Sequence, residues 1–115
     1  MVGAHPCRRQ LPFELRDSGD WSAALDQTLR NESYSHVNAI ETYNGRGTKR
    51  QNDFSLDVCQ RLGLPGTAGS DSHELRDVGA CATEFDAPIT SAADLIAELR
   101  AGRCRPVVLR PNTNP

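Results

Sequence analysis

The stretch VNAIETYNGRGTKRQNDFSLDVCQRLGLPGTA, residues 37–68, holds the unit that decides the fold. Val37–Tyr43 and Leu64–Ala68 are short apolar runs flanked by loop-rich sequence, which is typical of strands in a parallel sheet. Between them, apolar residues recur at helical spacing along one face: Phe54, Val58 and Leu62. Gly63 follows at the position where helices commonly end in a left-handed residue. The stretch therefore predicts a strand, a helix and a second strand.

The rest of the chain continues this alternation. One helix is predicted over Trp21–Leu29, and another over Ala92–Leu99, between a capping Ser91 and a terminating Gly102. Three further short apolar runs are predicted strands: Met1–Ala4, Val78–Ala82 and Pro106–Leu109. This order predicts an α/β fold with right-handed crossovers. We expect a partial (β/α) barrel, with a mostly parallel sheet of four or five strands and about three outer helices.

Composition excludes several classes of protein. The 115 residues suffice for one domain, which we place at residues 1–110, with 111–115 as a disordered tail. The net charge of −2 and the 5% of aromatic residues do not indicate a nucleic-acid partner. No apolar run approaches the roughly 18 residues of a membrane span, and no secretory leader is evident. We therefore expect a soluble domain without a membrane partner.

The four cysteines indicate the compartment. They are scattered along the chain without a Cys-x-x-Cys pair, which argues against a zinc ribbon or a disulfide framework. We expect them to be small buried hydrophobic residues in a reducing cytoplasm. Cys7 follows His5 by two residues, but that spacing alone does not create a nucleophile and its base.

Polar residues gather after the predicted strands, and Asp71-x-His73 is the most specific group among them. In extended chain these two side chains point to the same side, and a carboxylate with an imidazole suits Zn²⁺, Mn²⁺ or Fe²⁺. The alternative is that Asp71 caps a loop and His73 is a solvated turn residue. His5, before Pro6 at another strand end, adds a third ligand of the same kind.

Other polar residues at this edge can serve a substrate. Glu41 lies on one side of a predicted buried strand, where a carboxylate needs a cation or hydrogen bonds. An ion pair with Arg46 or Arg8 would meet this need as well as a direct role in a site. Arg8 and Arg9 can hold an anionic phosphate oxygen, although each can equally be a solvated surface arginine.

Four segments together resemble one family: GAHPCRR, VNAIETYNGR, GLPGTAGSDSHELRDVGACATEF and SAADLIAELRAGRCRP. They closely resemble the carboxyl-terminal half of PHP-domain proteins, the polymerase- and histidinol-phosphatase-type metallophosphoesterases. The resemblance is strongest from about His36 to Phe85, which matches the PHP-associated carboxyl-terminal segment.

The resemblance implies a fold, a reaction and a site. The fold is a distorted barrel with two or three divalent metals at the carboxyl ends of its strands, and the reaction is hydrolysis of a phosphate ester. The implied metal ligands are His5, Asp71 and His73, while Glu41 and Asn44 line the substrate pocket. An alternative from another class is a non-catalytic, PHP-derived oligomeric binding module.

The sequence also departs from the family. The family's amino-terminal His-x-His motif is absent, and a chain of this length holds roughly four of about seven β/α units. We therefore expect an incomplete catalyst that binds metal weakly or not at all on its own. Its open sheet edges are expected to be covered by a homo-oligomer or by the amino-terminal half of the barrel.

Overall fold

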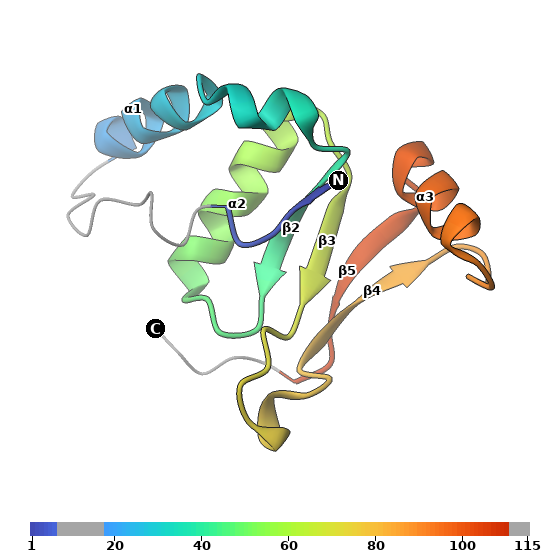
Figure 1. The fold of residues 1–115 in the computed structure, drawn as a ribbon. Coiled ribbons are helices and arrows are strands. Elements are labelled where there is room, and N and C mark those ends of the chain that lie inside the picture. The colour runs from blue at the N-terminus through green and yellow to red at the C-terminus, as the bar shows by residue number, and fades with distance from the viewer. Residues whose placement is uncertain (7–17, 111–115) are drawn as a thin grey trace.

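The computed structural model describes residues 1–6 and 18–110. Its first sheet has three parallel strands in the order β1-β2-β3: β1 (Val2–Gly3), β2 (Ala39–Asn44) and β3 (Gly66–Gly69). Val2 pairs with Ala39, and Ile40 pairs with Gly66. The short apolar runs predicted as strands thus form a parallel sheet, and the carboxyl ends of the three strands lie at one edge (Figure 1).

The helices α1 (Ser18–Leu29) and α2 (Lys49–Leu62) lie on one side of this sheet, with the short 3₁₀ helix Glu32–His36 leading into β2 (Figure 1). Phe54 and Val58 of the predicted stripe are fully buried and pack with Ile40 of β2. Gly63 ends α2 in the left-handed conformation, with φ of +64°. The strand–helix–strand prediction from the sequence is therefore confirmed.

The last part of the chain forms a second, antiparallel sheet. It consists of β4 (Cys81–Phe85) and β5 (Cys104–Val108), joined through α3 (Ala92–Ala101). Ser91 caps α3 by accepting the N–H of Asp94, and Gly102 ends it, as predicted. The expectation of a single, mostly parallel sheet is wrong for these two strands. The alternation of apolar and polar residues indicates a strand but not its direction. Here α3 lies beyond the end of the hairpin, so the chain returns alongside β4 in the opposite direction (Figure 1).

Side-chain hydroxyls join the two sheets. Thr83 of β4 accepts the N–H of Ala68 and donates to the Ala68 carbonyl, both at 3.0 Å. Ser70 donates to the Cys81 carbonyl at 2.9 Å. These bonds take the place of a backbone ladder along β3. Among the described residues, the strands form no closed barrel, and no helix has the length and apolar character needed to cross a membrane.

Candidate functional site

The predicted site residues lie at the carboxyl edge of the parallel sheet. His5 follows β1 by two residues, Asn44 is the last residue of β2, and Asp71 follows β3 by two residues. Because parallel strands end at the same edge, three distant segments of sequence meet there. Arg8 and Arg9, predicted to hold a phosphate oxygen, lie outside the described residues, as does Cys7.

The Glu41 carboxylate joins the ends of β1 and β2. Its Oε2 accepts the backbone N–H of His5 at 2.6 Å and the Nδ2 of Asn44 at 3.2 Å. Gly69 leaves room for it, since a Cβ there would lie 2.4 Å from Glu41 Oε1. The ion pair considered between Glu41 and Arg46 is not formed, because Arg46 pairs with Asp77 instead. Hydrogen bonds therefore meet the polar needs of this carboxylate.

Asn44 is held from the other side by Asn52 of α2, a residue that the sequence reasoning missed. The N–H of Asn44 donates to Asn52 Oδ1 at 3.0 Å, and Asn52 Nδ2 donates to the Asn44 carbonyl at 3.2 Å. Asn52 is buried, but two positions along a helix turn its side chain roughly 200° away from Phe54, so the apolar stripe gave no signal for it. The pair anchors the end of β2 to α2.

Asp71 and His73 lie close together, although not in extended chain. Asp71 has φ of +49°, a left-handed conformation that aspartate tolerates better than most residues. Its turn brings His73 Nδ1 to 2.8 Å from the Asp71 carbonyl oxygen and 3.9 Å from Asp71 Oδ1. A carbonyl can only accept, so Nδ1 carries the proton and Nε2 holds the lone pair that could bind a metal.

These residues give a partial donor set. Asp71 has an oxygen donor and His73 a nitrogen donor of the kinds that Zn²⁺ and Mn²⁺ bind, but the 3.9 Å distance joins Asp71 Oδ1 to the protonated Nδ1 and not to Nε2. Within residues 1–6 and 18–110, no three His, Cys, Asp or Glu side chains are placed to hold one metal ion together. His5 shares the edge with the pair but does not complete a three-residue cluster with it.

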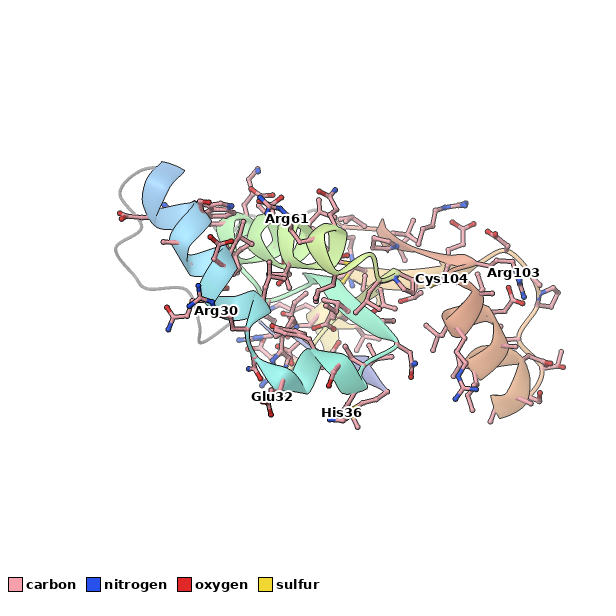
Figure 2. All side chains as sticks on the ribbon, turned by 90° about the horizontal axis from the view of Figure 1, so that it is seen from above. Arg30, Glu32, His36, Arg61, Arg103 and Cys104 are labelled. Atoms are coloured by element: carbon pink, nitrogen blue, oxygen red, sulfur yellow. The ribbon has the colours of Figure 1, made fainter. Side chains whose placement is uncertain are left out.

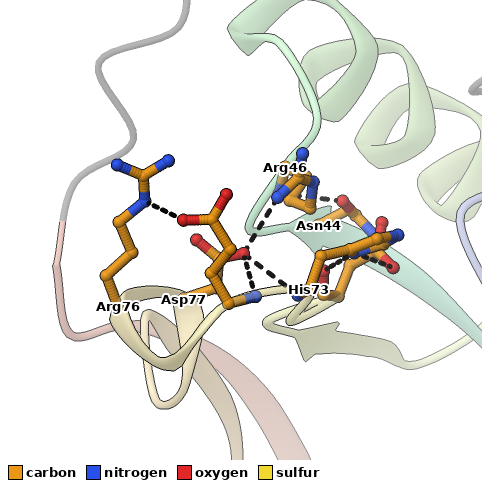
Figure 3. Close-up of polar contacts among 7 residues, drawn as sticks. Asn44, Arg46, His73, Arg76 and Asp77 are labelled. Atoms are coloured by element: carbon orange, nitrogen blue, oxygen red, sulfur yellow. Dashed lines mark hydrogen bonds and ion pairs between the residues drawn. The ribbon is translucent and has the colours of Figure 1, made fainter.

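Asp77 organises the loop that carries this pair (Figure 3). Its Oδ2 accepts the N–H groups of His73 and Glu74 at 3.0 and 3.1 Å and an N–H of Arg46 at 2.9 Å. The hydrogen bond from His73, which outweighs the effect of partial burial, holds the pKa of the Asp77 carboxyl below its usual value. The sequence reasoning missed Asp77. A carboxylate three residues after the start of a short turn is the signal that could have found it.

The described cysteines play no part in this chemistry. Cys59 and Cys81 are buried, Cys104 is half-buried, and all three are free thiols. Burial raises the pKa of each thiol, and for Cys81 the negative charge of Glu41 raises it further. Protonated thiols are poor nucleophiles and poor metal ligands. The prediction of small buried residues is confirmed for Cys59 and Cys81.

Residues 49–104 match a family described as PHP-associated, and they make up just under half of the chain. No curated protein and no solved structure matches the chain. The matched stretch runs from the start of α2 to the first residue of β5, and it includes Asp71, His73 and Asp77. His5, Glu41 and Asn44 precede it.

Proposed function

We propose that the chain is the carboxyl-terminal part of a PHP-type metal-dependent phosphoesterase, with His5, Asp71 and His73 as metal ligands. The observation that supports it is the shared carboxyl edge of β1, β2 and β3, where His5 follows β1 and Asp71 and His73 follow β3. The PHP-associated match supports the proposal because it covers Asp71 and His73. On its own, the chain is expected to be incomplete as a catalyst for hydrolysis of a phosphate ester.

The side chains at this edge have different proposed roles, as metal ligands or in the substrate pocket. Asp71 supplies an oxygen donor, and the bond from His73 Nδ1 to the Asp71 carbonyl directs the other ring nitrogen to ligation. Glu41 holds the His5 backbone and, with Asn44, lines the proposed substrate pocket. A bound divalent metal would lower the pKa of a water and polarise the phosphoryl group. Arg8 and Arg9 are proposed to hold the phosphate oxygens.

Two further features fit this assignment. The parallel sheet with α1 and α2 on one side is the layering expected of part of a barrel wall. Free, protonated thiols fit a reducing compartment, and we propose the cytoplasm.

Calorimetric titration with Zn²⁺ and with Mn²⁺ tests the ligand assignment. We expect weak binding that is abolished in Asp71→Ala and in His73→Ala, because the remaining ligands hold an ion poorly. The control is His36→Ala, which removes an exposed imidazole before the amino end of β2, labelled in Figure 2. Cys7→Ser should bind as the parent does. Unchanged affinity in Asp71→Ala, or loss in Cys7→Ser, would show that the site is misplaced.

A phosphatase assay tests the proposed incompleteness. Hydrolysis of p-nitrophenyl phosphate is measured with and without Mn²⁺, and little turnover is expected from the chain alone. Robust Mn²⁺-dependent turnover by the monomer would contradict the view that the site lacks ligands.

A non-catalytic oligomeric binding module is the second proposal, and one observation favours it. A groove of about 330 Å³ lies between the parallel sheet and α3. Its apolar lining comes from β1, β3, β4 and α3: Val2, Ala68, Phe85, Leu95 and Leu99. Metal binding that is lost in Asp71→Ala would favour the phosphoesterase over this module.

A further inference from the structure

We propose that Asp77 is a positioning residue, which holds the loop carrying Asp71 and His73 against the turn that follows β2. The inference rests on the proposed function, because it assigns Asp77 a role in placing two proposed ligands. Asp77 itself is not proposed as a ligand. It acts through the backbone of His73 and through Arg46 (Figure 3).

Hydrogen bonds from the loop backbone converge on one oxygen of Asp77. Asp77 Oδ2 accepts from the N–H groups of His73 and Glu74, which lie four and three residues earlier in the same loop. These bonds fold the loop back on itself directly at the proposed ligand His73. Charge-assisted hydrogen bonds of this kind are shorter and stronger than neutral ones.

Arg46 connects this loop to a part of the molecule that is anchored by hydrogen bonds. Arg46 Nη1 lies 2.9 Å from Asp77 Oδ2, and the Arg46 N–H donates to Asn44 Oδ1 at 3.0 Å. Asn44 is itself bonded to Asn52 of α2, and the N–H of Gly45 donates to the Gly69 carbonyl. The Asp77–Arg46 pair therefore connects the loop to the anchored ends of β2 and β3.

The loop itself has few apolar side chains packed into the core. Leu75 is 93% exposed and Val78 is 60% exposed, so neither side chain holds the loop in the core. Asp71, at the start of the loop, has a positive φ that the surroundings must maintain. Where apolar contacts are few, polar contacts decide whether a loop keeps one position.

The test compares Asp77→Ala with Asp77→Asn by nuclear magnetic resonance on the full chain. Asp77→Ala should speed amide hydrogen exchange at His73 and Glu74 at least tenfold. Asp77→Asn should restore most of the protection, since its amide oxygen can still accept both N–H groups. Glu84→Ala is the matched control, because Glu84 pairs with Arg105 at 2.8 Å on the hairpin instead.

A second measurement uses Mn²⁺ alone as the probe. Its paramagnetic broadening of the His5, Asp71 and His73 resonances reports their distance from a bound ion. Asp77→Ala should need about tenfold more Mn²⁺ for the same broadening at His73, in line with the usual effect of residues that orient ligands. Glu84→Ala should match the parent chain.

The outcomes separate the two proposals. Unchanged exchange at His73 and Glu74 in Asp77→Ala, or an equal loss of protection in Glu84→Ala, would overturn the role of Asp77. If Mn²⁺ broadens other resonances of the parent chain but not those of His5, Asp71 and His73, the proposed metal site fails. The exchange rates then still decide whether Asp77 positions the loop.

Discussion

Gly69 lies against the Glu41 carboxylate, and its missing side chain decides where that carboxylate can sit. A Cβ at this position would come within 2.4 Å of Glu41 Oε1, much closer than any ordinary contact. Glu41 is flexible enough to move aside, but it would then leave the His5 N–H and the Asn44 amide. A single glycine thus places the carboxylate that holds the end of β1.

Gly69→Ala is predicted to release His5 without unfolding the chain. The loss of two hydrogen bonds should lower the free energy of unfolding by about 1–3 kcal/mol, and amide exchange at His5 should accelerate. Denaturant unfolding and hydrogen exchange measure the two effects. Gly3→Ala is the control, since a Cβ there would meet its nearest neighbour, Val37, at an ordinary 3.7 Å. In Gly69→Ala, a further Glu41→Ala change should cost little, and full additivity would refute the mechanism.

At the scale of elements, Thr83 replaces a strand ladder between β3 and β4. Its hydroxyl satisfies both the N–H and the carbonyl of Ala68. Thr83→Val keeps the shape of the side chain but leaves these two backbone groups unpaired. We expect a loss of about 1–3 kcal/mol in the free energy of unfolding, measured by urea denaturation.

Thr67→Val is the matched control for this prediction. Thr67 lies on β3 next to Ala68, is buried, and its hydroxyl makes no hydrogen bond within the described part of the chain. The same exchange should therefore cost less there. Equal losses for the two variants would mean that the Thr83 hydroxyl does not join the strands.

The stability of α3 is predicted to depend on pH, because carboxylates at its two ends accept hydrogen bonds. Arg103 donates to both carboxylate oxygens of Glu98, at 2.9 and 2.6 Å, and these bonds hold the pKa of Glu98 below its usual value. The contribution is complete above the unfolded pKa of about 4.3 and is lost as the pH falls through the lower folded pKa. The Thr90 hydroxyl lowers the pKa of Asp94 in the same direction.

Stability measured by urea denaturation should thus fall as the pH drops from about 5 to about 3, and Glu98→Gln should flatten part of this fall. The remaining acid dependence should shrink further when Asp94→Asn is added. A Glu98→Gln chain that loses stability as steeply as the parent over this range would contradict the assignment.

At the scale of the whole molecule, α3 stands to one side of the parallel sheet, beyond the hairpin (Figures 1 and 2). Leu95 is 37% exposed and Ile96 is 49% exposed on this helix. Such a surface favours association. We predict a homodimer or larger oligomer at tens of micromolar, seen by light scattering.

Leu95→Asp should shift this equilibrium toward the monomer, since Leu95 lines the groove beside α3. Ala97→Asp is the control, because two residues along a helix turn a side chain roughly 200° away from the groove. A parent chain that stays monomeric at this concentration would refute the prediction.

Local patterns were sufficient for the helices, for most of the strands and for the edge at which the polar residues meet, although the strand predicted over Val78–Ala82 lies at Cys81–Phe85. The stripe of Phe54 and Val58, the left-handed Gly63 and Gly102 and the capping Ser91 are signals between residues a few positions apart. Such signals depend only on residues a few positions apart, so they predict the same helix wherever its apolar face is buried. Parallel strands then bring His5, Asn44 and Asp71 to one edge without further information.

Only the tertiary structure decided the partners of those residues. The direction of β5 depends on where α3 lies, and the bonds of Asn52 to Asn44 and of Asp77 to Arg46 join residues 8 and 31 positions apart. Glu41 had two arginines as plausible partners in sequence, yet it bonds a backbone amide 36 residues away. Periodicity tells which side of an element is buried, whereas a hydrogen bond needs two particular atoms within about 3 Å. That geometry arises only when the loops, the helices and the sheet are packed together.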